Sequence, residues 1–142
     1  MYKLFATVLA LTAAGCATPY QSGTFSLTGG FYESVGPGRL EKIAFSGNGF
    51  INADTVEQYT LYRCAEAAKS RNKSHFLIFD SLIQASIGKP SERPNVGSVG
   101  GKPTGFAFVL FLDGPQPGAR ETDKVLRELE AVVKQNQTEP KS

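Results

Sequence analysis

The 142-residue sequence contains no Trp, one Met, one His and two Cys. One His and two Cys form no cluster at metal-ligand spacing, so we expect neither a metal nor a cofactor. The formal net charge is only +2, which gives no strong field to attract nucleic acid. The apolar run at residues 4–14 is shorter than the roughly 20 residues of a membrane-spanning helix. Ten Phe and many aliphatic residues are left to build one modest core.

The first sixteen residues have the layout of a bacterial lipoprotein signal. One basic residue precedes the apolar run at 4–14, and the small residues Ala-Ala-Gly lead directly to Cys16. This pattern predicts a signal peptide at 1–15 and acylation of Cys16, with palmitate among the expected chains. The next residue, Ala17, is not the Asp that retains such proteins in the inner membrane, so an outer-membrane location is favoured. An ordinary secretory signal cut near Ala14 or Ala17 is the alternative.

The remaining chain reads as one domain with short polar ends. Residues 16–24 are predicted to be the lipidated N-terminus and a tether, because Pro, Gly and small polar residues cannot pack a core. Residues 25–136 are predicted to form a single domain, and residues 137–142 a frayed tail. A Gly-, Pro- and Ser-rich stretch at 86–104 is predicted to be a long loop.

Hydrophobic periodicity predicts an α+β fold. The expected strands are at 25–34, 39–46, 75–80 and 105–113, and the expected helices are at 53–71 and 122–136. This β-β-α-β-β-α order predicts a two-layer sandwich, in which two helices cover one face of a mostly antiparallel four-stranded sheet. The strands at 75–80 and 105–113 are apolar on both faces, so the second face also needs a cover. We expect the loop at 86–104 to provide it, with the first segment or a partner protein as alternatives.

Few side chains suggest chemistry, and we predict no catalytic residue. Cys64 falls on the apolar face of the first helix, which favours buried packing over a nucleophile. His75, at a strand start, is expected to be a surface or capping residue. Asp80 and Asp113 each follow an apolar strand, and antiparallel pairing would place them at opposite ends.

The best candidate for binding is the turn formed by Ser46, Gly47, Asn48 and Gly49. Its glycines and its position before a helix could orient backbone N–H groups toward an anion. The alternative is a plain strand-to-helix turn with Asn48 in the left-handed conformation.

Several segments together resemble an uncharacterised family of bacterial envelope lipoproteins. The matching residues are Ser-Gly-Asn-Gly-Phe at 46–50, Thr-Val-x-x-Tyr-x-Leu-x-Arg-x-Ala-Glu at 55–66, His-Phe at 75–76 and Gly-Gly-Phe at 29–31. The resemblance covers about half of the mature chain. It implies a lipid-anchored envelope protein with a β-β-α-β-type domain and no assigned activity.

The sequence thus predicts a non-catalytic lipoprotein of the bacterial outer membrane, held on the periplasmic side by acyl chains on Cys16. Its expected partners are the membrane itself and an envelope protein or the cell wall, and not nucleic acid. The alternative is a periplasmic domain that binds a small ligand or the cell wall through the Ser46–Phe50 turn and the long loop.

Overall fold

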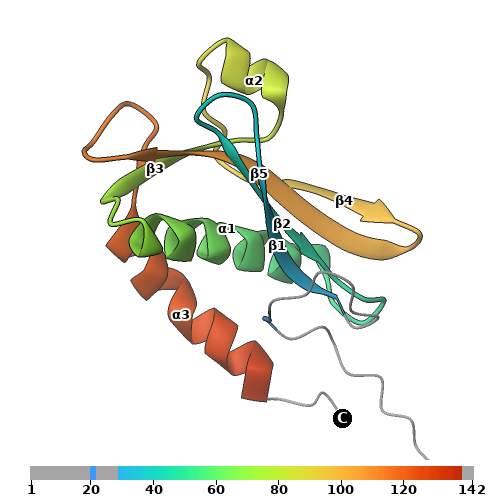
Figure 1. Ribbon diagram of the computed structural model, residues 1–142. Helices are drawn as coiled ribbons and strands as arrows, with labels where there is room; N and C mark the ends of the chain where they lie inside the picture. The colour runs from blue at the N-terminus through green and yellow to red at the C-terminus, as the bar shows by residue number, and fades with distance from the viewer. Residues whose placement is uncertain (1–19, 22–28, 139–142) are drawn as a thin grey trace, which may run out of the picture.

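The computed structural model describes residues 20–21 and 29–138, with side chains up to residue 135. Within these residues the chain forms an α+β domain with an open antiparallel sheet (Figure 1). The strands are β1 (Gly30–Val35), β2 (Glu41–Ser46), β3 (His75–Phe79), β4 (Asn95–Val99), β5 (Lys102–Leu112) and β6 (Arg120–Glu121). The helices are α1 (Ala53–Ser70), α2 (Leu82–Ser86) and α3 (Thr122–Thr138).

The predicted layout of four strands and two helices is too simple. The six strands and three helices include α2, β4 and β6, which the sequence analysis did not predict. The predicted loop at 86–104 contains β4 and the start of β5, joined by a tight hairpin. Gly100 and Gly101 both have positive φ angles, of 58° and 75°, which residues with a side chain rarely adopt. Backbone pairing with β5 therefore forms strand β4 in a segment whose sequence does not alternate between polar and apolar residues.

The sheet order is β1-β2-β5-β3-β6, and every pairing is antiparallel. The predicted hairpin of the first two strands is confirmed, with Gly30 opposite Ser46 and Val35 opposite Glu41. β3 and β4 both pair with the same edge of β5: Phe79 lies opposite Phe108, and Asn95 lies opposite Phe106. The chain therefore leaves this edge after β3 and returns at β4, and we call residues 80–94 the excursion.

Helix α1 lies directly on one face of the sheet (Figure 1). The side chain of Asn52 caps its first turn by accepting from the backbone N–H of Thr55 at 2.8 Å. Gly105 of β5 allows a close approach, because a Cβ atom there would lie 2.5 Å from Oγ1 of Thr60. The core on this side comprises small α1 residues and the inward side chains of the strands, including Cys64, Ala67, Ala68, Phe76, Ile78 and Val109.

Helix α3 is on the same side of the sheet and packs mainly against α1 (Figure 1). Its apolar stripe contributes Val125, Leu126 and Leu129 to the main core cluster. Helices α1 and α3 therefore share one core, although α3 packs on α1 more than on the strands. Across residues 20–21 and 29–138, no helix has both the length and the apolar character needed to span a membrane.

The second face of the sheet is apolar and partly covered by the chain itself. Leu77, Phe79 and Leu112 form a buried cluster there. Ala85 of α2, Leu40 of the β1–β2 turn and Ala119 pack against this cluster. The cover therefore comes from the excursion and two turns, rather than from the whole stretch 86–104.

Candidate functional site

The position where the chain joins the domain is defined by Tyr20, the first described residue. Cys16, the predicted lipidation site, lies outside the described residues, four positions earlier. The ring of Tyr20 lies 5.1–5.4 Å, between centroids, from the rings of Phe31, Tyr59 and Tyr62. The carbonyl of Gln21 accepts a hydrogen bond from the N–H of Phe31 at 2.8 Å. Tyr20 and Gln21 therefore pack on the helix-covered side of the sheet.

Five charged side chains join α1 to the edge of the sheet, and we call them the charged ladder: Glu33, Glu41, Arg63, Glu66 and Arg71. Arg63 lies 2.5 Å from Glu33 and 3.2 Å from Glu66, between nitrogen and oxygen atoms. Arg71 contacts Glu33 at 3.3 Å and binds Glu41 with both Nε and an Nη atom. These contacts hold edge strand β1 against α1, so the charged ladder has a clear structural role.

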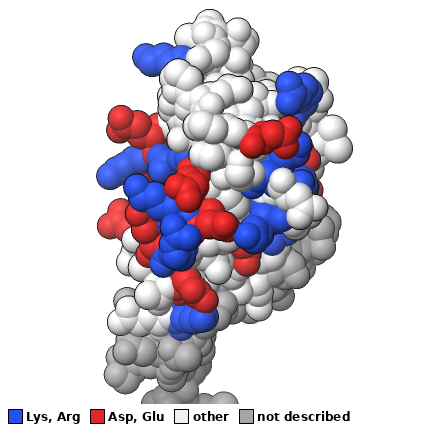
Figure 2. All heavy atoms as spheres, turned by 90° about the vertical axis from the view of Figure 1, so that its left-hand side faces the viewer, with Lys and Arg blue, Asp and Glu red and all other residues white. Residues whose placement is uncertain are grey.

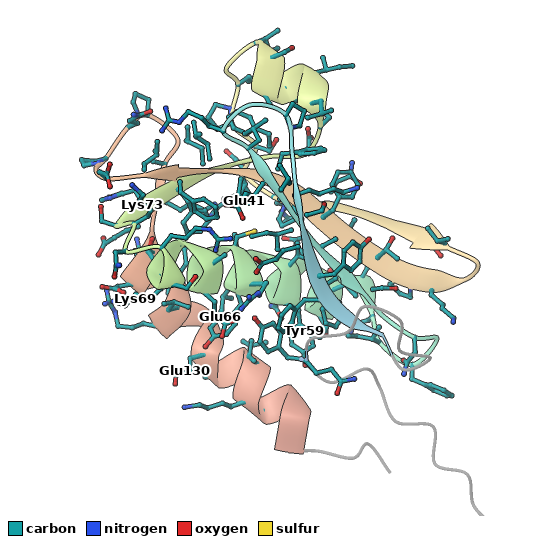
Figure 3. All side chains as sticks on the ribbon, in the orientation of Figure 1. Glu41, Tyr59, Glu66, Lys69, Lys73 and Glu130 are labelled. Carbon is teal, nitrogen blue, oxygen red and sulfur yellow. The ribbon has the colours of Figure 1, made fainter. Side chains whose placement is uncertain are left out.

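Glu66 is the acid of the charged ladder that contacts Tyr20. Burial raises the pKa of its carboxyl from 4.5 to about 7. The carboxylate accepts hydrogen bonds from the Tyr20 hydroxyl and from Arg63. Figure 3 shows Glu66 and Tyr59 along the same stretch of α1. The seat of Tyr20 thus includes a group that titrates near neutral pH.

Two polar groups of the predicted binding turn, Ser46 to Gly49, form hydrogen bonds within the domain. The N–H of Gly47 donates to the carbonyl of Pro103 at 2.8 Å, and the Asn48 side chain accepts from the N–H of Phe50 at 3.0 Å. A Cβ atom on Gly47 would lie 2.2 Å from Cγ2 of Ile51, so close packing requires glycine there. Asn48 is not left-handed, because Asn72 is the only non-glycine residue with positive φ among those described. The geometry gives the turn a packing role, and its anion-binding role stays a prediction.

The second cysteine is a core residue, as its place in the sequence indicated. Cys64 is fully buried and unpaired with another cysteine. Burial raises the pKa of its thiol to about 12, so the thiolate that a nucleophile needs is suppressed at neutral pH.

A polar hollow of about 410 Å³ lies where α1 ends and α3 begins. His75 is part of its lining, with Nδ1 2.9 Å from Oγ of Ser74. Lys69 and Lys73, labelled in Figure 3, also line it, and each is ion-paired, Lys69 with Asp123 at 2.8 Å and Lys73 with Asp113 at 2.7 Å. The hollow therefore has balanced charge and suits a polar, uncharged group.

The acids that follow the apolar strands do not form a pair. Asp80 and Asp113 stand at opposite ends of the antiparallel β3–β5 pair, as that geometry requires. In the part of the chain that the structure describes, no three His, Cys, Asp or Glu side chains gather as metal ligands would.

The least expected feature is an exposed apolar surface at one end of the domain, which we call the apolar end: Leu82, Ile83 and Ile87, in and directly after α2. The exposed fractions are 44% for Leu82, 74% for Ile83 and 65% for Ile87. Leu40 and Ala85 pack on the same cluster, which brings the β1–β2 turn and α2 together at this end (Figure 1). On the face that Figure 2 shows, the top of the molecule, around α2, carries no acidic side chain.

The excursion that carries α2 is firmly braced. The backbone N–H of Ser91 donates to the carbonyl of Ile78 at 2.8 Å, and that of Lys89 donates to the carbonyl of Gln84 at 3.0 Å. The N–H of Asp80 donates to Oγ of Ser91 at 2.9 Å. A cap by Ser81 begins α2, and Gly88, with a φ of +65°, follows its end. The exposed side chains of α2 are thus presented on a fixed backbone.

Comparisons of the chain with protein-family models, with curated proteins and with solved structures found no match.

Sequence reasoning missed the apolar end because the predicted loop began too late, at residue 86. A local signal was present in residues 81–88, where a capping serine and a glycine enclose Leu82, Ile83 and Ile87. At 3.6 residues per turn these three side chains share one side of a short helix. Only the tertiary structure shows that Ala85, and not this apolar side, packs on the sheet.

Proposed function

We propose that the chain is a bacterial envelope lipoprotein, anchored in the outer membrane by acyl chains on Cys16. Its domain faces the periplasm and binds another envelope component without catalysing a reaction. The observation that carries the proposal is the apolar run closed by small residues and Cys16. Four residues later, Tyr20 is seated on the domain, so the anchor and the fold are closely linked.

A binding role is supported by the apolar end. Soluble domains rarely cluster large apolar side chains on the surface unless a partner or membrane covers them. Ile83 and Ile87 are mostly exposed although their backbone is held in place, which is the arrangement expected of a recognition surface. The non-catalytic reading is supported by the burial of Cys64 and its raised pKa, which remove the chain's best nucleophile from use.

Comparing the two cysteines in the native host tests the anchor. The Cys16→Ser protein is expressed behind an ordinary secretory leader, which is cut directly before position 16. Each buried CH₂ of an acyl chain contributes about 0.8 kcal/mol to membrane binding, so losing all the chains should release the protein. We expect the wild type and the matched Cys64→Ala variant to fractionate with outer membranes, and the Cys16→Ser protein to be soluble. A Cys16→Ser protein that still sediments with outer membranes would contradict the assignment.

A second candidate, a domain that binds a small cell-wall ligand, is favoured by the polar hollow. Its volume of about 410 Å³ falls within the range of small-molecule sites. Calorimetric titration of the purified domain with soluble peptidoglycan fragments tests this function. Saturable binding that a His75→Ala variant loses would support it, whereas the absence of binding heat would count against it.

A further inference from the structure

The apolar end carries an inference about the kind of partner that the domain binds. The second face of the sheet is covered by Ala85, Leu40 and Ala119, and none of these side chains belongs to the apolar end. Leu82, Ile83 and Ile87 add little to the fold, yet a braced excursion presents them. An occupant from outside the domain is therefore the simplest reason for their exposure.

The place where the chain joins the domain argues against the anchoring bilayer as this occupant. Tyr20 packs on the helix-covered side, against the cluster that contains Tyr59. Leu77 points to the opposite face, because successive residues of β3 alternate between faces and Phe76 and Ile78 lie in the helix-side core. Ala85 of α2 packs against the cluster that contains Leu77. The four residue steps from Cys16 to Tyr20 reach at most about 14 Å. An anchor at Cys16 therefore draws the helix side toward the membrane and leaves the apolar end pointing away.

The charges around the apolar end argue against a second copy of this chain. Two exposed cations lie close to it: Lys89 follows α2 in the sequence, and Arg39 precedes Leu40, which packs on the same cluster as Ala85 of α2. Asp80, just before α2, is half-buried and accepts a hydrogen bond from the Ser81 hydroxyl, and Glu92 lies near the far end of the excursion. Two such ends face to face would bring like charges together, which is unfavourable. Acidic groups on an occupant would instead be attracted.

We propose that the apolar end docks into an apolar groove with an acidic rim on a periplasm-facing partner protein. Leu82, Ile83 and Ile87 fill the groove, and Arg39 and Lys89 meet the rim. The direction in which this surface faces rests on the proposed lipid anchor, whereas its binding chemistry does not. Acylation of Cys16 is tested by the fractionation experiment, so failure of either idea can be recognised separately.

Site-specific crosslinking in the native host identifies the occupant. A benzophenone side chain at position 83 of the full-length protein samples the apolar end. The same group at position 99 is the matched control, because Val99 is also an exposed aliphatic residue, 70% exposed, on a different hairpin. We expect ultraviolet light to give a protein adduct from position 83 and none of the same mass from position 99.

Binding of the captured protein, purified and titrated with the purified domain, decides whether the contact is specific. Replacing both Ile83 and Ile87 by Ser should weaken binding about tenfold or more, because apolar area on both is buried in the complex. Val99→Ser should leave the affinity unchanged. Lys89→Gln should weaken binding less at high salt than at low salt, since screening already removes its attraction to an acidic rim.

Four results would overturn the proposal: adducts to lipid, adducts only to another copy of the chain, no adduct at position 83, or binding unaffected by the double Ser variant. Both isoleucines are exposed, so the variants should retain the wild-type circular dichroism spectrum and melting temperature. If the double variant does not fold, single variants Ile83→Ser and Ile87→Ser, each expected to weaken binding, replace it.

Discussion

Replacing Glu66 by Gln removes the titrating group from the seat of Tyr20 and should change how stability depends on pH. Burial raises the pKa of this carboxyl from 4.5 to about 7 in the folded protein. The folded state therefore holds the proton more tightly than the unfolded chain does. Stability falls as the pH rises from about 4.5 to about 7, because ionising the buried carboxyl disfavours the folded state.

The size of the effect follows from the difference between these two pKa values. Each pH unit between them is worth about 1.4 kcal/mol, which sets an upper limit of about 3.4 kcal/mol. The Glu66 side chain is 31% exposed, and solvent screening reduces the expected loss. We expect the free energy of unfolding of the wild type to fall by about 1–2 kcal/mol between pH 4.5 and 8 from this group alone.

Urea unfolding, followed by circular dichroism at several values between pH 4.5 and 8, measures this loss. At pH 4.5 the free energy of unfolding of Glu66→Gln should not exceed that of the wild type. Between pH 4.5 and 8 the difference between the two should shift by about 1–2 kcal/mol in favour of the variant. Glu128→Gln is the matched control, because Glu128 is on α3 and its side chain is 61% exposed. It should follow the wild-type profile. Parallel profiles for Glu66→Gln and the wild type would refute the reasoning.

Two further substitutions test the packing of α1 on the sheet. Cys64→Ala should lower the free energy of unfolding by about 1 kcal/mol or less, because it removes one small buried atom. The native thiol should react with Ellman's reagent only on unfolding, and rapid reaction at pH 8 would contradict its burial. Gly105→Ala should cost about 1–3 kcal/mol, because its Cβ would lie 2.5 Å from Oγ1 of Thr60. Gly49→Ala, at an open turn position, is the control for loss of glycine, and equal costs at both sites would argue against the close contact.

The regular elements could be predicted because their periodicity is strong. Strands β2 and β3, and helices α1 and α3, begin and end within about two residues of their predicted positions. Their apolar residues recur at intervals that match one buried face, so local sequence and tertiary packing agree. Strand β4 was not predicted, because most of its side chains are exposed and show no alternating pattern. Its place in the sheet comes from backbone pairing with β5 across the Gly-Gly turn.

The candidate surfaces were less predictable because they depend on contacts between distant residues. The Arg63–Glu66 pair was visible at helix spacing, but Glu33 and Glu41 join it only through the register of the β1–β2 hairpin. The excursion was missed because no local pattern indicates that β3 and β4 share one edge of β5. Tertiary pairing alone places α2 and the β1–β2 turn together.

Intact mass spectrometry of the mature protein, isolated from membranes of its native host, tests the central claim most directly. A chain that begins at residue 16 and carries the mass of three acyl chains is the result that a lipid-anchored envelope protein requires. A chain that retains residues 1–15, or one that begins at an unmodified residue, would contradict it.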